Sequence, residues 1–126
     1  MISSVLNILG MVFVLLFIAL VIYVVYERWY QHPLRLPIQQ ATSMIKSGAI
    51  NKVVDVRTDA EWDNGHYSGA VHLPLAKIDQ ARMILDIGDS ILVYCNTGTR
   101  ARQAAMKLKE MGYQRVYYIA ETYHEL

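Results

Sequence analysis

The 126-residue sequence predicts a single α/β domain, a mainly parallel sheet with helices on both faces, preceded by one transmembrane helix. An uncharged apolar stretch comes first, and beyond it short apolar runs alternate with helix-like segments. Strands separated by helices are typical of a parallel sheet that is covered on both faces. The chain divides into an anchor at 1–30, a linker at 31–37 and the α/β domain at 36–126.

The apolar stretch at residues 5–26 contains no charged residue and has the length of a membrane span. At about 1.5 Å per residue it extends about 30 Å, the thickness of a hydrocarbon core. A signal peptide needs a basic segment before the apolar core and a small-residue cleavage site after it, and neither pattern is found here. The stretch therefore favours an uncleaved, single-pass anchor. Aromatic residues suited to the membrane interface follow it: Tyr23, Tyr26, Trp29 and Tyr30.

The distribution of charge predicts the topology and limits the partners. Basic residues such as Arg28, Arg35 and Lys46 follow the span and none precedes it, so the positive-inside rule places the domain in the cytoplasm. A reducing compartment also fits a single cysteine. The formal net charge is only +1 and there is no lysine or arginine block, so nucleic acid is not expected as a partner. The oligomeric state stays open.

Hydrophobic periodicity and turn residues predict the order of elements in the domain. The first short helix after a strand opens with a capping box, in which Thr58 is the N-cap and Glu61 follows three residues later. The expected helices cover 38–47, a short segment up to 64, 76–85 and 100–111, and the expected strands cover 53–56, 70–73, 90–94 and 115–119.

The only cysteine, Cys95, lies between the predicted strand 90–94 and a polar loop that leads into a helix at Arg100. Loop amides and the positive end of the helix dipole would then face the sulfur and favour the thiolate. In a parallel sheet, ligands bind at the carboxyl ends of the strands, where Cys95 is expected. The alternative is that Cys95 is a small buried hydrophobic residue, as most free cysteines in strands are.

Three sequence blocks, in this order and spacing, resemble the rhodanese-like sulfurtransferases over about residues 36–119. The blocks are Asp55-Val56-Arg57 with Glu61-Trp62, then Gly65-His66-Tyr67-Ser68-Gly69-Ala70-Val71-His72-Leu73-Pro74, then Val93-Tyr94-Cys95-Asn96-Thr97-Gly98-Thr99-Arg100. The resemblance implies a thiosulfate sulfurtransferase whose cysteine takes sulfane sulfur from thiosulfate or a persulfide donor protein. The persulfide would then pass its sulfur to a thiol or to cyanide, without a cofactor.

The resemblance also assigns roles to individual residues. Cys95 is implied as the nucleophile, and the loop that follows it is implied as the substrate cradle. Arg100 can supply positive charge and a planar fork for an anionic donor. We expect structural support from Asp55, Arg57, Glu61 and His66. The histidines show no metal-ligand spacing, so no metal site is expected. The implied cradle consists of Asn96, Thr97, Gly98, Thr99 and Arg100.

Two other classes of function are compatible with parts of the sequence, a phosphatase or arsenate reductase and a non-catalytic binding module. Tyrosine-type and dual-specificity phosphatases also use a cysteine and an arginine, but their loop is one residue longer than the four residues between Cys95 and Arg100 here. Arsenate reductase chemistry would need a second cysteine to resolve the intermediate. A non-catalytic binding module at the membrane is the other alternative. It is favoured by Ala120 and Glu121, which replace the Gly-Gly pair that usually follows the last strand of a rhodanese domain.

Overall fold

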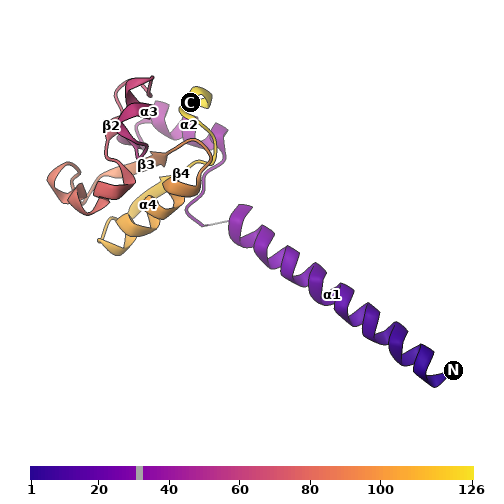
Figure 1. Ribbon diagram of the computed structural model, residues 1–126. Coiled ribbons are helices and arrows are strands. Elements are labelled where there is room, and N and C mark those ends of the chain that lie inside the picture. Colours follow the sequence, from indigo (N-terminus) through magenta and orange to yellow (C-terminus); the bar gives the residue numbers. More distant parts are fainter. Residues whose placement is uncertain (31–32) are drawn as a thin grey trace. The chain divides into compact units, whose positions relative to one another are not determined.

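The computed structural model describes residues 1–30 and 33–126, except the side chains of residues 29 and 30 (Figure 1). Part of the predicted linker, residues 31 and 32, therefore lies outside the described residues, as do the side chains of the interfacial aromatics at 29 and 30. The chain forms two compact units, Met1–Pro33 and Leu34–Leu126. Each unit has its own architecture.

The first unit is one long apolar helix, α1 (Ile2–Tyr30). Residues Ile2–Arg28 have a mean hydropathy of 3.2, and none of the most apolar window is buried. The helix is therefore long and apolar enough to cross a membrane, a property that it shares with signal sequences.

The second unit is built on a four-stranded sheet with the order β2-β1-β3-β4. All of its strand pairs are parallel, as the sequence predicts. The prediction of a buried strand at 70–73 is wrong in extent, because β2 has only two residues and both are half-buried. It lies at the sheet edge, where it pairs with β1 alone. The strands are β1 (Lys52–Asp55), β2 (Val71–His72), β3 (Ser90–Tyr94) and β4 (Arg115–Tyr118).

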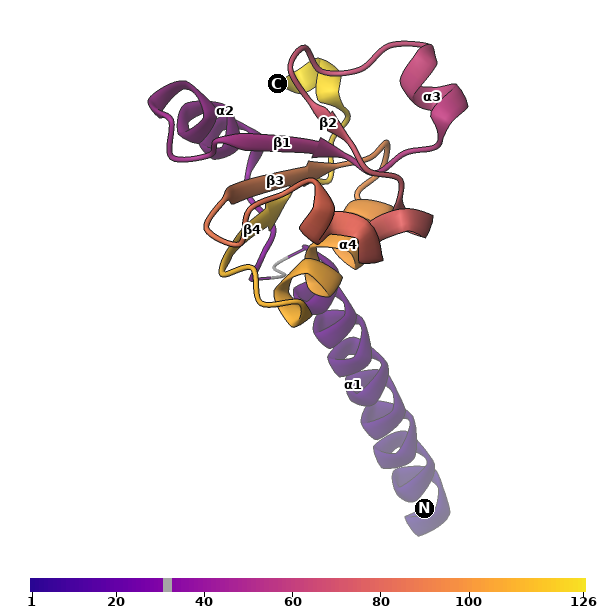
Figure 2. The same cartoon turned by 90° about the vertical axis from the view of Figure 1, so that its left-hand side faces the viewer.

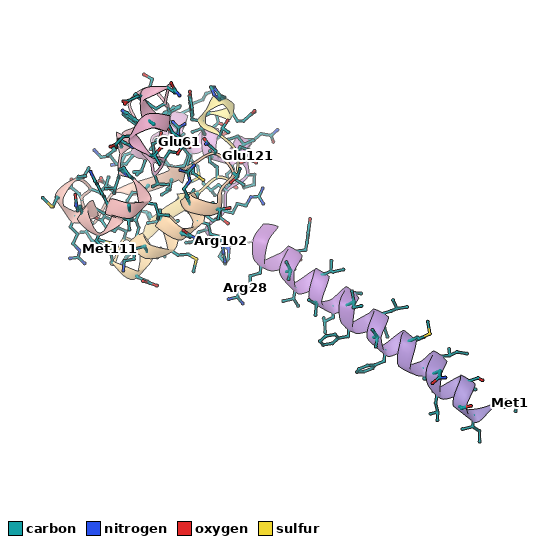
Figure 3. The ribbon with its side chains drawn as sticks, viewed as in Figure 1. Met1, Arg28, Glu61, Arg102, Met111 and Glu121 are labelled. Atoms are coloured by element: carbon teal, nitrogen blue, oxygen red, sulfur yellow. The ribbon has the colours of Figure 1, made fainter. Side chains whose placement is uncertain are left out.

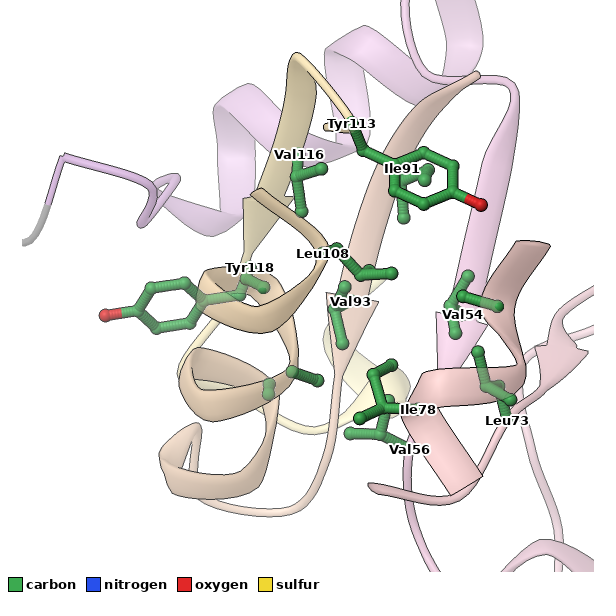
Figure 4. Packing of buried hydrophobic residues seen from close by; sticks show 14 of the residues in the cluster. Val54, Val56, Leu73, Ile78, Ile91, Val93, Leu108, Tyr113, Val116 and Tyr118 are labelled. Carbon is green, nitrogen blue, oxygen red and sulfur yellow. The ribbon is translucent and has the colours of Figure 1, made fainter. Parts of the chain in front are cut away.

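Helices cover both faces of this sheet, and Figure 2 shows α2 (Ile38–Ser47) and α4 (Thr99–Glu110) on opposite sides of it. Successive strand residues point to opposite faces, so each face buries alternate side chains. Val53 and Leu92 belong to the core under α2. On the other face, α4 packs on a larger core (Figure 4) that includes Val54, Val93, Leu108 and Val116.

The segment before β3 differs from the regular helix that we expect at 76–85. It is a 3₁₀-helix, η1 (Leu75–Met83), interrupted at Lys77, which has φ −111° and ψ 15°. Only Ile78 and Ala81 are buried in it. An apolar face this narrow gives a long α-helix little to pack, and short 3₁₀ turns are the usual result.

The remaining elements enclose the carboxyl edge of the sheet. Helix α3 (Asp59–Asp63) begins with the predicted capping box, and the chain ends in a short 3₁₀-helix, η2 (Tyr123–Glu125).

The end of the predicted linker joins the sheet beside β4. Leu36 N–H donates to the Tyr118 carbonyl at 2.9 Å, and Tyr118 N–H donates to the Leu34 carbonyl at 2.9 Å. The domain therefore includes the chain from Leu34 onward.

Candidate active site

Cys95 follows β3 directly and precedes the loop that leads into α4. The strands are parallel, so the carboxyl ends of β1 and β3 meet at the same edge, and Asp55 pairs in register with Tyr94. The blocks around Asp55 and Cys95, separated in sequence, thus come together at this edge. This is where open α/β sheets bind their ligands.

Backbone amides of the loop and of α4 point at the sulfur of Cys95. Gly98 N–H donates to Sγ at 3.1 Å, and Ala101 N–H is 3.4 Å from Sγ. The expectation that amides face the sulfur is therefore confirmed. Two amide donors at the start of a twelve-residue helix stabilise negative charge on the sulfur.

Cys95 is also part of the hydrophobic core. It is only 1% exposed and belongs to the same cluster as Val93 and Ala101. Burial alone is what we expect of an inert thiol. The two amide donors distinguish this sulfur from a thiol that is packed only among apolar side chains.

Glu61 first caps its own helix. Its carboxylate accepts hydrogen bonds from the Thr58 backbone N–H at 3.2 Å and from the Thr58 hydroxyl at 2.9 Å. In return, Thr58 Oγ1 accepts a bond from Glu61 N–H at 3.3 Å. This reciprocal capping box holds the carboxylate in one orientation at the start of α3.

The same carboxylate binds the loop after Cys95. Asn96 Nδ2 donates to Glu61 Oε2 at 2.6 Å, and Arg100 donates from Nη1 to Oε1 at 2.6 Å and from Nη2 to Oε2 at 2.9 Å. The hydrogen bond from Arg100, and to a smaller extent those from Thr58, hold the pKa of Glu61 well below its usual range. Figure 3 marks Glu61 on the domain. The sequence predicts structural support from Glu61 but not this contact with the loop.

Arg100 therefore binds Glu61 with its guanidinium at the end of the loop. Its pKa is raised, mainly by the hydrogen bond to Glu61 and to a smaller extent by the charges of Glu61 and Cys95. Its side chain is one third exposed. Two of its N–H groups are committed to Glu61, and the others are available to an anion.

A buried polar network lies beneath the loop. Arg57 binds Asp55 through Nε at 3.1 Å and Nη2 at 2.7 Å, and its Nη2 also donates to the Gly65 carbonyl at 2.7 Å. The Tyr94 hydroxyl donates to Asp55 at 2.6 Å. Burial, and then this bond to Asp55, raise the pKa of Tyr94. The network joins the sheet to the turn after α3, which agrees with the structural role expected of Asp55 and Arg57.

His66 also lies where a structural role is expected. Its Nδ1 is 2.9 Å from the Trp62 carbonyl, and its ring stacks on the Trp62 ring with 3.4 Å between the centroids. The His72 ring stacks on Trp62 as well, at 4.5 Å. Within the described residues, no group of His, Cys, Asp and Glu side chains has the arrangement of a metal site.

The tail after β4 packs against the loop. Gly98 has φ +92°, and a Cβ at this position would lie 2.7 Å from the Ala120 Cα. Tyr123 extends the contact, because the Arg57 guanidinium lies 5.1 Å from its ring centroid. Tyr123 is a site neighbour that the sequence did not predict. No pattern near Tyr123 in the sequence signals its contact with Arg57.

The site is thus defined by a cysteine in an amide cradle at the carboxyl edge of a parallel α/β sheet. The family model for the rhodanese-like domain matches residues 38–126, so the chain belongs to the rhodanese-like family.

Two curated relatives each match about half of the chain. The thiosulfate sulfurtransferase PspE of Escherichia coli (strain K12) is 37% identical over 65 residues, which cover 50% of this chain and 62% of that protein. The putative sulfur carrier protein YrkF of Bacillus subtilis (strain 168) is 33% identical over 64 residues, which cover 51% of this chain and 35% of that protein. The matches thus span less than two thirds of these two relatives.

Solved structures share the fold. A human single-domain sulfurtransferase, TSTD1, superposes with a TM-score of 0.66 at 22% identity, covering 73% of this chain and 93% of that chain. A rhodanese with anions from E. coli has a TM-score of 0.52 at 32% identity, covering 60% of this chain and 89% of that chain. The first supports the fold alone, and the second also shares close to a third of the aligned residues.

Proposed function

We propose that this chain is a membrane-tethered sulfurtransferase that carries sulfane sulfur as a persulfide on Cys95. The donor is thiosulfate or a persulfide, and the acceptor is a thiol or cyanide. The observation that carries the proposal is the pair of amide donors on the Cys95 sulfur, from Gly98 at 3.1 Å and Ala101 at 3.4 Å. They favour the thiolate that must attack the donor, and they can also stabilise the persulfide anion that results.

The loop supplies the rest of the cradle. Gly98 leaves its amide free to turn toward the sulfur, since its positive φ is available to glycine at no steric cost. Arg100 lies at the end of the loop and provides positive charge beside the reacting sulfur. The relatives named thiosulfate sulfurtransferases, and the E. coli rhodanese described with anions, support sulfur transfer from an anionic donor.

A non-catalytic binding module is the second candidate. It is favoured by the burial of Cys95 and by the contact of Ala120 with the loop at Gly98. Phosphatase and arsenate reductase functions are less consistent with the chain. The loop has one residue too few for the phosphatase cradle, and the sequence has no second cysteine.

We place the domain on the cytoplasmic face of a membrane, anchored through residues 5–26 of α1. The proposal is supported by the length and mean hydropathy of α1 and by Arg28 in its last turn. Reporter domains fused to the C-terminus test this topology. A cytoplasmic reporter should be active in cells and fractionate with membranes, whereas release of a shortened, soluble product would indicate a cleaved signal sequence.

Turnover of the full chain in detergent micelles tests the proposed chemistry. With thiosulfate and cyanide as substrates, the wild type should form thiocyanate, and the Cys95→Ser variant should form none above the uncatalysed rate. Hydrolysis of an aryl phosphate is measured in parallel. Phosphate release that depends on Cys95, without thiocyanate formation, would overturn the proposal in favour of a phosphatase. No turnover of either substrate, and none with an organic persulfide as donor, would support the binding module.

A further inference from the structure

The contact between Glu61 and the loop bears on which sulfur donor the site accepts. Glu61 lies on α3, 39 residues before Arg100 in the sequence, and yet both of its carboxylate oxygens bind the Arg100 guanidinium. One of those oxygens also accepts the bond from Asn96. Arg100 and Asn96 are the two long polar side chains of the loop, and Glu61 restrains both.

We propose that Glu61 sets donor specificity, by restraining Arg100 so that the site favours a singly charged organic persulfide over dianionic thiosulfate. This inference rests on the proposed sulfurtransferase function. Glu61 is a positioning residue in it, because it touches Arg100 and Asn96 rather than the reacting sulfur.

The charges around the sulfur give the physical reason. A Cys95 thiolate and the Glu61 carboxylate carry two negative charges, and Arg100 carries one positive charge. The pair of Glu61 and Arg100 is neutral as a unit, so the Glu61 carboxylate weakens the positive charge that Arg100 offers to a donor at the thiolate. The Glu61 and Arg100 side chains are 27% and 33% exposed, so solvent weakens their attraction without abolishing it.

The two donors respond differently to this arrangement. Thiosulfate carries two negative charges on a small ion and needs a cation to offset its repulsion from the thiolate. The N–H groups of Arg100 that Glu61 leaves open can still bind its sulfonate oxygens, but the Glu61 carboxylate offsets the charge that would attract the dianion. An organic persulfide carries one negative charge and an apolar or weakly polar group. Its binding is therefore weakened less than that of thiosulfate when Arg100 is already paired with Glu61.

In the transfer step the same kinds of bond form and break with either donor. The Cys95 thiolate attacks the outer, sulfane sulfur, a bond forms between Sγ and that sulfur, and the donor's S–S bond breaks. The leaving group takes the electron pair of the broken bond and departs as a thiolate from a persulfide or as sulfite from thiosulfate. Cys95 is left as a persulfide anion, and no external oxidant or reductant is needed.

The Glu61→Gln variant separates an effect on donor specificity from an effect on the structure of α3. Glutamine at this position can still accept from Thr58, so the capping box is kept, while the negative charge is lost. Asp59→Asn is the matched control. It removes the same charge from the first turn of the same helix, its side chain is 79% exposed, and its ionic contact is with His72 at 3.8 Å.

The experiment measures KM and kcat of the full chain in micelles with thiosulfate and with 2-hydroxyethyl persulfide. The wild type should have the lower KM for the persulfide. In Glu61→Gln the KM for thiosulfate should fall about fivefold, the size of one partly exposed charge interaction, while the KM for the persulfide stays within about twofold. Asp59→Asn should leave both values within about twofold of the wild type.

The outcomes are separable. If Glu61→Gln lowers kcat/KM for both donors by the same factor, Glu61 only supports the fold of the loop and the specificity proposal is overturned. A wild type that prefers thiosulfate also overturns it. If neither donor places sulfur on Cys95 in any variant, the proposed function itself fails, and the absence of the adduct by mass spectrometry identifies that case. Circular dichroism of each variant confirms that it is folded.

Discussion

Two arginine–carboxylate pairs lie at the carboxyl edge of the sheet, and they differ in depth. In the inner pair, Asp55 and Arg57, the side chains are 0% and 6% exposed. In the outer pair, Glu61 and Arg100, both side chains are about one third exposed. In both pairs the arginine uses two nitrogens on one carboxylate, Nε and Nη2 in the inner pair and Nη1 and Nη2 in the outer pair.

The difference in burial gives the two pairs different roles: the inner pair supports the fold, and the outer pair bears on donor specificity. A buried ion pair that loses one partner leaves an uncompensated charge in the protein interior, so the inner pair is fixed by the fold. The outer pair is in contact with solvent, which weakens the attraction between its charges, and Glu61 can be replaced there without leaving a buried charge. The inner arginine–carboxylate pair therefore stabilises the edge of the sheet, and the outer pair restrains the loop after Cys95.

The largest effect should follow from breaking the inner pair. In Arg57→Ala the Asp55 carboxylate stays buried without its cation, and the free energy of unfolding should fall by about 3–5 kcal/mol. Urea unfolding of the full chain in micelles, followed by tryptophan fluorescence, measures it. A loss below about 1 kcal/mol would mean that the two pairs do not differ as described.

A smaller loss should follow from Gly98→Ala, which alters the loop that the outer pair restrains. The added Cβ would meet the Ala120 Cα at 2.7 Å, and φ +92° is unfavourable for alanine. We expect a loss on the order of 1–3 kcal/mol from strain, together with loss of the amide bond to Cys95. The unfolding free energy and the rate of Cys95 alkylation report the two effects. An unchanged alkylation rate would show that the cradle does not depend on this backbone conformation.

The smallest effect should come from breaking the outer pair. Glu61→Gln should lower the unfolding free energy by about 1 kcal/mol or less at neutral pH. Because folding lowers the pKa of Glu61 from its ordinary value of 4.5, the stabilisation is present above that pH and is lost as the pH falls below it. The difference between wild type and variant in urea should therefore narrow toward about pH 3. A difference that is constant with pH would exclude the ion pair as its source.

Local patterns in the sequence predicted most of the fold. The apolar run before Cys95, the alanine-rich face of α4 and the capping box at Thr58 each depend on neighbours within a few residues. The structure confirms all three. The segment at 76–85 was predicted as a regular helix, but its apolar face is too narrow to hold one, and it forms the interrupted helix η1.

The candidate site could be predicted only in part. The position of Cys95 and the amides at its sulfur follow from a strand, a loop and a helix that are adjacent in the chain. The contacts of Glu61 with Asn96 and Arg100 join residues 35 and 39 positions apart, and they depend on the register between β1 and β3. Tyr123 reaches Arg57 from the tail. No local pattern encodes these distances.

The most direct measurement of the account is the mass of Cys95 after exposure to a sulfur donor. The full chain in micelles is incubated with thiosulfate or 2-hydroxyethyl persulfide and examined by intact-mass and peptide-mapping mass spectrometry. Alkylation of the untreated chain serves as the control that the thiol can react. We predict a gain of one sulfur atom on Cys95, removed by dithiothreitol or cyanide and absent in Cys95→Ser. No gain with either donor, in a chain whose Cys95 is readily alkylated, would contradict the account.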